Sequence, residues 1–161
     1  MNDLFNLEDN GAEFSECRKY RFALWRIWDK SKPLVMFIGL NPSTANEDTD
    51  DPTIQSVIRI AKNNGYGGIY MMNCFSYIST DPDKLYDCSG WIENEKHLKE
   101  IASKCNEVVF AWGNFKVVQK LGVDYLLFRM FPNAKCIMKN KNGSPGHPLF
   151  KKGITRLINF K

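Results

Sequence analysis

The chain contains two kinds of apolar pattern, short continuous runs and segments in which apolar residues recur three and four positions apart. Continuous apolar runs at residues 34–38, 68–72 and 108–112 predict buried parallel strands, because a strand covered on both faces is apolar throughout, and residues 134–138 are predicted to form a fourth strand. Residues 20–28 instead mix aromatic and aliphatic side chains with arginines, which predicts an antiparallel edge strand. No comparable pattern precedes this stretch, so residues 1–18 are expected to lack regular structure.

The segments between these runs carry helix signals. One helix is predicted to begin after Asp51, which can cap it, with Pro52 in the first position, and to stop at Gly65. Apolar residues spaced three and four apart predict three more helices, at residues 98–105, 114–131 (with a break at Gly122) and 149–160.

This order of strands and helices predicts an α/β fold. We expect a three-layer α/β/α sandwich with a central, mostly parallel four-stranded sheet and the antiparallel strand at its edge. A chain of 161 residues is long enough for one well-buried core and too short for two ordinary domains. Residues 1–161 are therefore interpreted as a single domain.

Composition narrows the class of protein. No apolar stretch approaches the roughly 20 residues that cross a bilayer, and no basic segment followed by an apolar one opens the chain, so a cytoplasmic protein is expected. The five cysteines include no CxxC pair, which indicates neither a disulfide framework nor a metal site. No cofactor or metal is predicted.

Charge is distributed unevenly. Residues 125–161 contain eight basic residues and no Asp or Glu, although the whole chain has a net charge of only +4. Such a one-signed segment is typical of a surface that binds phosphate, and DNA or RNA is the predicted partner. A solubilising lysine surface explains the pattern equally well.

Polar side chains follow three of the predicted strands. Asn41, Asn73 and His147 each come after the carboxyl end of a strand, where open α/β sheets bind their ligands. An amide offers both a donor and an acceptor, and His147 is held between Gly146 and Pro148. Trp112 ends the remaining central strand, where it either packs in the core, the favoured interpretation, or lines the cleft.

The connection from residue 40 to residue 51 is longer than the roughly 2 to 6 residues typical of such loops. It carries Asp48, Asp50 and Asp51, which would repel a phosphate. Acidic residues before a helix complement its dipole, and this interpretation is favoured. Binding of Mg²⁺ and duty as a general base remain as alternatives.

Short motifs then suggest a family. The string Gly39-Leu40-Asn41-Pro42-Ser43 and the string His147-Pro148-Leu149 resemble the first and last motifs of the uracil-DNA glycosylase superfamily. At closer range, FIGLNPSTA, DDPT and GHPL resemble a bacterial and phage family of uncharacterised domains assigned to that superfamily. The resemblance implies the glycosylase-like version of the three-layer fold.

The resemblance also implies roles. Asn41 would orient the attacking water, Asn73 would bind the base, and His147, as a neutral donor, would stabilise charge on a carbonyl oxygen. Further residues are assigned to base or ligand binding (Gly39, Leu40, Pro42, Ser43, Phe75 and Trp112) and to phosphate binding (Lys151 and Lys152).

The implied activity is that of an N-glycosylase, a hydrolase, acting on nucleic acid. Two other functions stay open. The protein could be an enzyme on a free nucleoside or nucleotide, with the acidic loop as metal ligand or base. It could also be a binding module for nucleic acid or a partner that performs no reaction.

Overall fold

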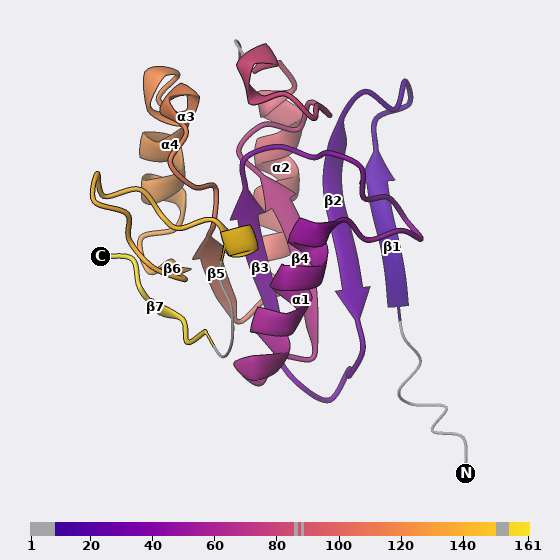
Figure 1. Ribbon diagram of the computed structural model, residues 1–161. Helices are drawn as coiled ribbons and strands as arrows, with labels where there is room; N and C mark the ends of the chain where they lie inside the picture. Colours follow the sequence, from indigo (N-terminus) through magenta and orange to yellow (C-terminus); the bar gives the residue numbers. More distant parts are fainter. Residues whose placement is uncertain (1–8, 86, 88, 151–154) are drawn as a thin grey trace.

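A mixed seven-stranded sheet forms the centre of the protein (Figure 1). The computed structural model describes residues 9–85, 87, 89–150 and 155–161. The strand order is β1-β2-β4-β3-β5-β6-β7. The central strands β3 (Leu34–Gly39), β4 (Gly68–Asn73), β5 (Glu107–Phe110) and β6 (Lys135–Cys136) pair in parallel, β3 with both β4 and β5, and β5 with β6.

Antiparallel strands extend the sheet on both sides. β2 (Arg21–Ile27) pairs with β4, β1 (Asp9–Phe14) pairs with β2, and β7 (Ile158–Asn159) pairs with β6. Because β2 runs opposite to β4, its first residue lies at the edge where the parallel strands end. This edge carries the candidate site.

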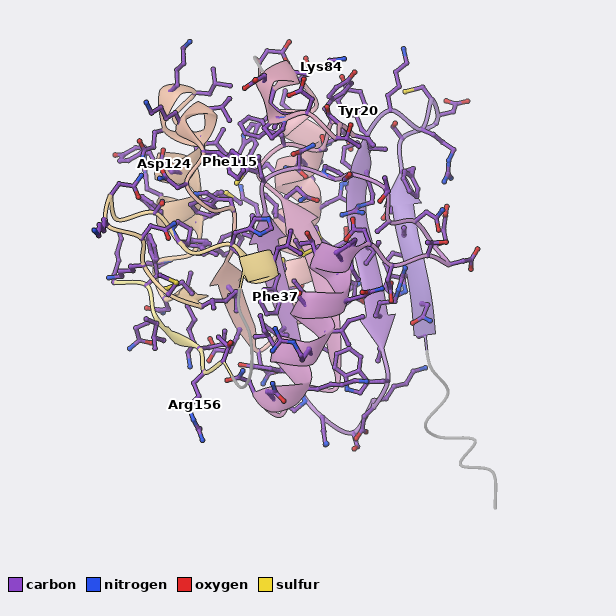
Figure 2. The ribbon with its side chains drawn as sticks, in the orientation of Figure 1. Tyr20, Phe37, Lys84, Phe115, Asp124 and Arg156 are labelled. Atoms are coloured by element: carbon purple, nitrogen blue, oxygen red, sulfur yellow. The ribbon has the colours of Figure 1, made fainter. Side chains whose placement is uncertain are left out.

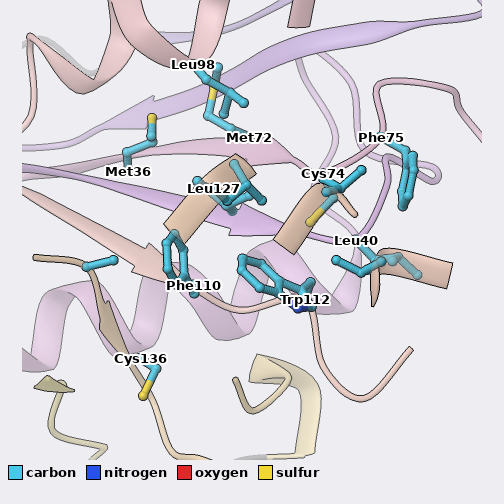
Figure 3. Packing of buried hydrophobic residues seen from close by; sticks show 14 of the residues in the cluster. Met36, Leu40, Met72, Cys74, Phe75, Leu98, Phe110, Trp112, Leu127 and Cys136 are labelled. Carbon is cyan, nitrogen blue, oxygen red and sulfur yellow. The ribbon is translucent and has the colours of Figure 1, made fainter. Parts of the chain in front are cut away.

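Helices cover both faces of the sheet. Val35 and Phe37 of β3 pack with α1 (Pro52–Asn63), whereas Met36 and Ile38 pack in the cluster that includes α2 (Trp91–Ala102). α3 (Lys116–Lys120) and α4 (Val123–Met130) join the α2 side, part of which Figure 3 shows. Short 3-10 turns lie at Pro82–Lys84 and Pro148–Phe150. None of the helices within the described part of the chain could reach across a bilayer.

The predicted start of the first helix is confirmed. Asp51 is the N-cap of α1, its Oδ1 accepts a hydrogen bond from the Ile54 amide at 2.9 Å, and Pro52 opens the helix. The predicted break at Gly122 is confirmed as well, because this glycine separates α3 from α4 with a φ of 72°. The mixed α/β class follows from the same local signals.

Two predictions about the amino-terminal part are wrong. Asp9–Phe14 forms β1 instead of an irregular lead-in. β2 therefore pairs with a strand along each of its edges and is not an edge strand. Gly11 lies directly beneath the Trp25 ring, where a Cβ atom would overlap it. The pairing therefore depends on a contact between strands, which local apolar periodicity does not reveal.

The helix predicted over residues 149–160 is also wrong where the structure describes the chain. Ile158 belongs to β7 and is 47% exposed, whereas Phe160 is buried against Phe110 and Phe128. Asn64, just after α1, binds this segment by donating to Thr155 O at 2.7 Å and accepting from Leu157 N at 3.2 Å. An amide side chain thus fixes the chain in an extended path.

Candidate functional site

The strand register brings the predicted amides together. Gly39, the last residue of β3, pairs with Asn73, the last residue of β4. The backbone continues this pairing, since Cys74 N donates to Gly39 O at 2.8 Å and Phe75 N donates to Leu40 O at 2.9 Å. Asn41 and Asn73 therefore follow neighbouring strands at one edge of the sheet.

A cavity of about 160 Å³ opens at this edge. It brings together residues from the ends of β3 and β4, the start of β2, the first turn of α1 and two later loops. Its walls include the predicted Gly39, Leu40, Asn41, Ser43, Asp51, Asn73 and His147, together with Arg21, Thr53, Ile54, Met71, Ser79, Thr80, Pro82 and Phe115. Pro42 is buried beside the cavity but does not line it.

Asn41 is held as a hydrogen-bond acceptor. Its Nδ2 donates to Pro42 O at 2.9 Å and to Ser79 O at 2.8 Å. Since carbonyl oxygens accept only from the NH₂ end of an amide, these bonds fix which way the side chain is turned. The Oδ1 atom of Asn41 is left to accept from a ligand or a water.

Asn73 is turned the opposite way. It is 3% exposed, and its Oδ1 accepts from Arg21 Nη2 at 3.3 Å. Its Nδ2 lies over Gly39, where an added Cβ atom would come within 3.2 Å of it. Asn73 therefore presents a donor, and the glycine provides the space that the amide occupies.

Arg21 is the charged residue of the cavity that the sequence did not predict. Its side chain is buried, its Nη1 donates to Ala45 O at 3.1 Å, and its Nε has no partner among the described residues. Burial lowers the pKa of Arg21 to about 10, partly opposed by the charge of Asp51 and reinforced by that of Arg26. A buried guanidinium without a bonded carboxylate is expensive, so its place in a cavity wall indicates a role toward a ligand.

His147 enters the cavity on a tightly packed turn. Gly146 N donates to Met138 O at 2.7 Å, and a Cβ atom at Gly146 would overlap the Met138 side chain. The amide of Leu149 donates to His147 Nδ1 at 3.1 Å, which places the proton of the neutral ring on Nε2. Burial lowers the pKa of His147, and the nearby charge of Asp51 opposes this. The ring is therefore neutral at physiological pH, with a donor at Nε2.

The acidic residues of the loop are used differently from one another. Asp50 forms a 2.8 Å ion pair with the buried Arg26, and Asp48 is exposed. Asp51 alone among them lines the cavity while capping α1. Within the described ranges, no three His, Cys, Asp or Glu side chains are grouped as metal ligands.

Phe75, assigned to ligand binding, does not line this cavity, and Trp112 packs in the core, which confirms the favoured interpretation of its position. Phe75 and Trp112 are 4% and 2% exposed and pack in the core on the α2 side of the sheet (Figure 3). Phe115, labelled in Figure 2, provides the aromatic wall instead. Gly113, with a φ of 79°, turns the chain so that Phe115 and His147 approach the same point.

The predicted phosphate-binding residues Lys151 and Lys152 lie outside the described residues. Of the other basic residues near the carboxyl end, Lys135 pairs with Glu107 at 3.4 Å, and Lys139 lies over the Phe160 ring at 5.5 Å. These contacts place both residues toward the β6 and β7 side of the sheet.

Comparison with known protein families gives one match. A family model described as "Protein of unknown function (DUF1643)" matches residues 21–149. The chain belongs to the DUF1643 family. Every described residue that lines the cavity falls inside the stretch that defines DUF1643, which begins at Arg21 and ends just after His147.

Membership of DUF1643 brings no activity with it and no link to the uracil-DNA glycosylases. A search of curated proteins and a search of solved structures each found no match.

Proposed function

We propose that the cavity binds a nucleobase and that the protein hydrolyses the N-glycosidic bond of that base in nucleic acid. The observation that supports this most is the convergence of Asn41, Asn73 and His147, from three separate segments, on one small cavity. The proposal includes a three-layer, glycosylase-like arrangement of the fold, which the helices on both faces of the sheet support.

Apolar residues of the cavity wall would contact the flat face of the base, and polar residues would bind its edge. Phe115 offers an aromatic surface on which a planar base stacks, and Ile54 and Met71 add apolar contact. Asn73 donates to the edge of the base. His147, neutral and protonated on Nε2, lies in the same wall as a second donor.

The reaction needs a water that is held and then deprotonated. Asn41 Oδ1 accepts from the water and orients it, but an amide cannot take its proton. Asp51 is the carboxylate in the described wall of the cavity, and it takes that proton in our proposal. The water oxygen bonds to the sugar C1′, the bond from C1′ to the base nitrogen breaks, and its electron pair leaves with the base.

Base release tests the proposal. Oligonucleotides that contain uracil, mismatched thymine, and deaminated or alkylated bases are incubated with the protein, and free base is measured by mass spectrometry. We expect the protein to release free base, Asn41→Ala to abolish this release, and Asn133→Ala to leave it intact. Asn133 is the control because it is an exposed amide outside the cavity. No release from any member of the panel would contradict the proposal.

Asp51→Asn provides a second, sharper variant. Asparagine caps helices about as well as aspartate, so the variant keeps the bond to Ile54 N and the fold. We expect it to lose roughly 10²- to 10⁴-fold in rate, the range typical of a general base. An unchanged rate would remove Asp51 from the mechanism and leave water activation to another group.

A free nucleoside is the second candidate substrate. The loop that follows Asn41 carries the exposed Asp48 and the ion-paired Glu47 close to the site, and such charge disfavours an approaching phosphate backbone. Release from nucleosides with none from oligonucleotides would favour this candidate. Salt-sensitive binding of DNA or RNA, weakened by Lys151→Ala and Lys152→Ala, would favour nucleic acid.

A further inference from the structure

Arg21 and Asn73 form a wall of the cavity that offers mainly hydrogen-bond donors. The amide oxygen of Asn73 is turned toward Arg21 and accepts from its Nη2, so the NH₂ group is the part of the amide that is left without a bonded partner for a ligand. Arg21 itself has five N–H donors and no acceptor. This wall therefore favours a ligand with an acceptor atom, whereas an N–H group on the ligand would face the charge of Arg21 and would compete with it for the Asn73 oxygen.

The charge of Arg21 is fixed in place and poorly neutralised. Its Nη groups bond to the neutral oxygens of Ala45 and Asn73, and none of the described carboxylates forms a hydrogen bond with it. Asp51 from α1 attracts it through space, whereas Arg26 from its own strand repels it. His147, which lines the cavity together with Arg21 and Asp51, is neutral above its lowered pKa. An oxygen that carries negative charge would supply the missing partner.

We propose that Arg21 is a positioning residue and counter-charge that makes this cavity select a planar ring bound through a negatively charged oxygen, as in the ionised lactam of an oxo-base. The inference rests on the proposed assignment of the cavity to a nucleobase. Arg21 then determines which protonation state of the ligand the cavity binds. Bases that present an amino group at this position, such as cytosine and adenine, are rejected.

Binding of free bases tests this without any catalysis. Uracil, 5-fluorouracil and cytosine are titrated into the protein by calorimetry between pH 7 and 9, where His147 stays neutral. 5-Fluorouracil is close to uracil in shape but has a more acidic ring N–H. It is expected to bind more tightly than uracil, and the Kd of uracil should fall about tenfold per pH unit, in step with the ionised fraction. Cytosine should not bind measurably.

Two variants separate the two roles of Arg21. Arg21→Gln keeps an NH₂ donor for the Asn73 oxygen but removes the charge, so we expect the pH dependence to disappear while weak binding remains. Arg21→Lys keeps the charge but loses the planar guanidinium group with its paired N–H donors, so we expect part of the pH dependence to survive. A purely structural role would weaken binding equally at every pH. Circular dichroism of each variant confirms that the fold is retained.

Several results would overturn the inference. They are equal affinities for uracil and 5-fluorouracil at pH 7, a pH-independent Kd, an unchanged pH profile in Arg21→Gln, or equally tight binding of inorganic phosphate. Absence of binding by every base would overturn it as well. If bases bind as described but none is ever released from a nucleoside or oligonucleotide, the proposed hydrolysis fails and this inference stands.

Discussion

The ion pair between Arg26 and Asp50 gives one residue of the acidic loop a structural role. The Arg26 side chain is 6% exposed, and besides Asp50 Oδ1 at 2.8 Å it bonds to backbone oxygens that include Asn46 O at 2.6 Å and Trp25 O at 2.8 Å. Losing one partner of a buried pair costs about 3–5 kcal/mol. Because Asp50 is 31% exposed and can regain water, we expect Arg26→Met to lower the free energy of unfolding by about 3 kcal/mol.

A double-mutant cycle measured by urea unfolding isolates the pair. Asp50→Asn keeps an acceptor but loses the charge and should cost about 1–2 kcal/mol, and the coupling energy with Arg26→Met should be about 1–2 kcal/mol. The matched control is the exposed pair between Arg18 and Glu47 of the same loop, at 2.9 Å, whose removal should leave the urea midpoint unchanged. A coupling energy near zero would refute the structural role of Asp50 and reopen metal binding by the loop.

Other predictions concern the cavity and the thiols. The lowered pKa of His147 means that the unfolded chain binds its proton first, so stability should fall as the pH drops below about 6.5, and His147→Gln should flatten that part of the curve. Gly39→Ala should abolish ligand binding, because the added methyl group displaces the Asn73 amide. It should lower the free energy of unfolding by only about 1–2 kcal/mol, because the nearest atom, the end of the Met71 side chain, can move. Unchanged binding would contradict the placement of Asn73. Among the described cysteines, the exposed Cys17, whose pKa is lowered by its hydrogen bond with Ser15, should be alkylated first. Peptide mapping that finds the buried Cys74 labelled before Cys17 would contradict this.

Local signals were sufficient for much of the fold. The cap at Asp51 and the glycine at 122 act within a few residues, so the sequence predicts α1 and the break between α3 and α4 correctly. The position of β7 depends instead on which of two nearby apolar residues, Ile158 or Phe160, faces inward. That choice is made by an aromatic cluster with Phe110 and by the side chain of Asn64, far away in the sequence.

The candidate site divides in the same way. Asn41, Asn73 and His147 were predictable because each follows a strand in an order that brings parallel strand ends together. Arg21 was not, because its place at that edge depends on β2 running antiparallel to β4. An arginine that opens a strand whose other residues, apart from Arg26, are apolar is the one signal that could have drawn attention to it. Phe115 was missed because the left-handed Gly113 redirects the chain after β5.

Asn41 and Asn73 are proposed to face a single base-binding cavity, on which both the hydrolysis and the selection of the ligand depend. Nitrogen-15 NMR of the asparagine side-chain amides during a titration with uracil at pH 9 tests it most directly. We predict that the signals of Asn41 and Asn73 shift along one saturation curve, while that of the exposed Asn133 stays fixed. Shifts confined to surface amides, or no shift at any uracil concentration, would contradict the claim.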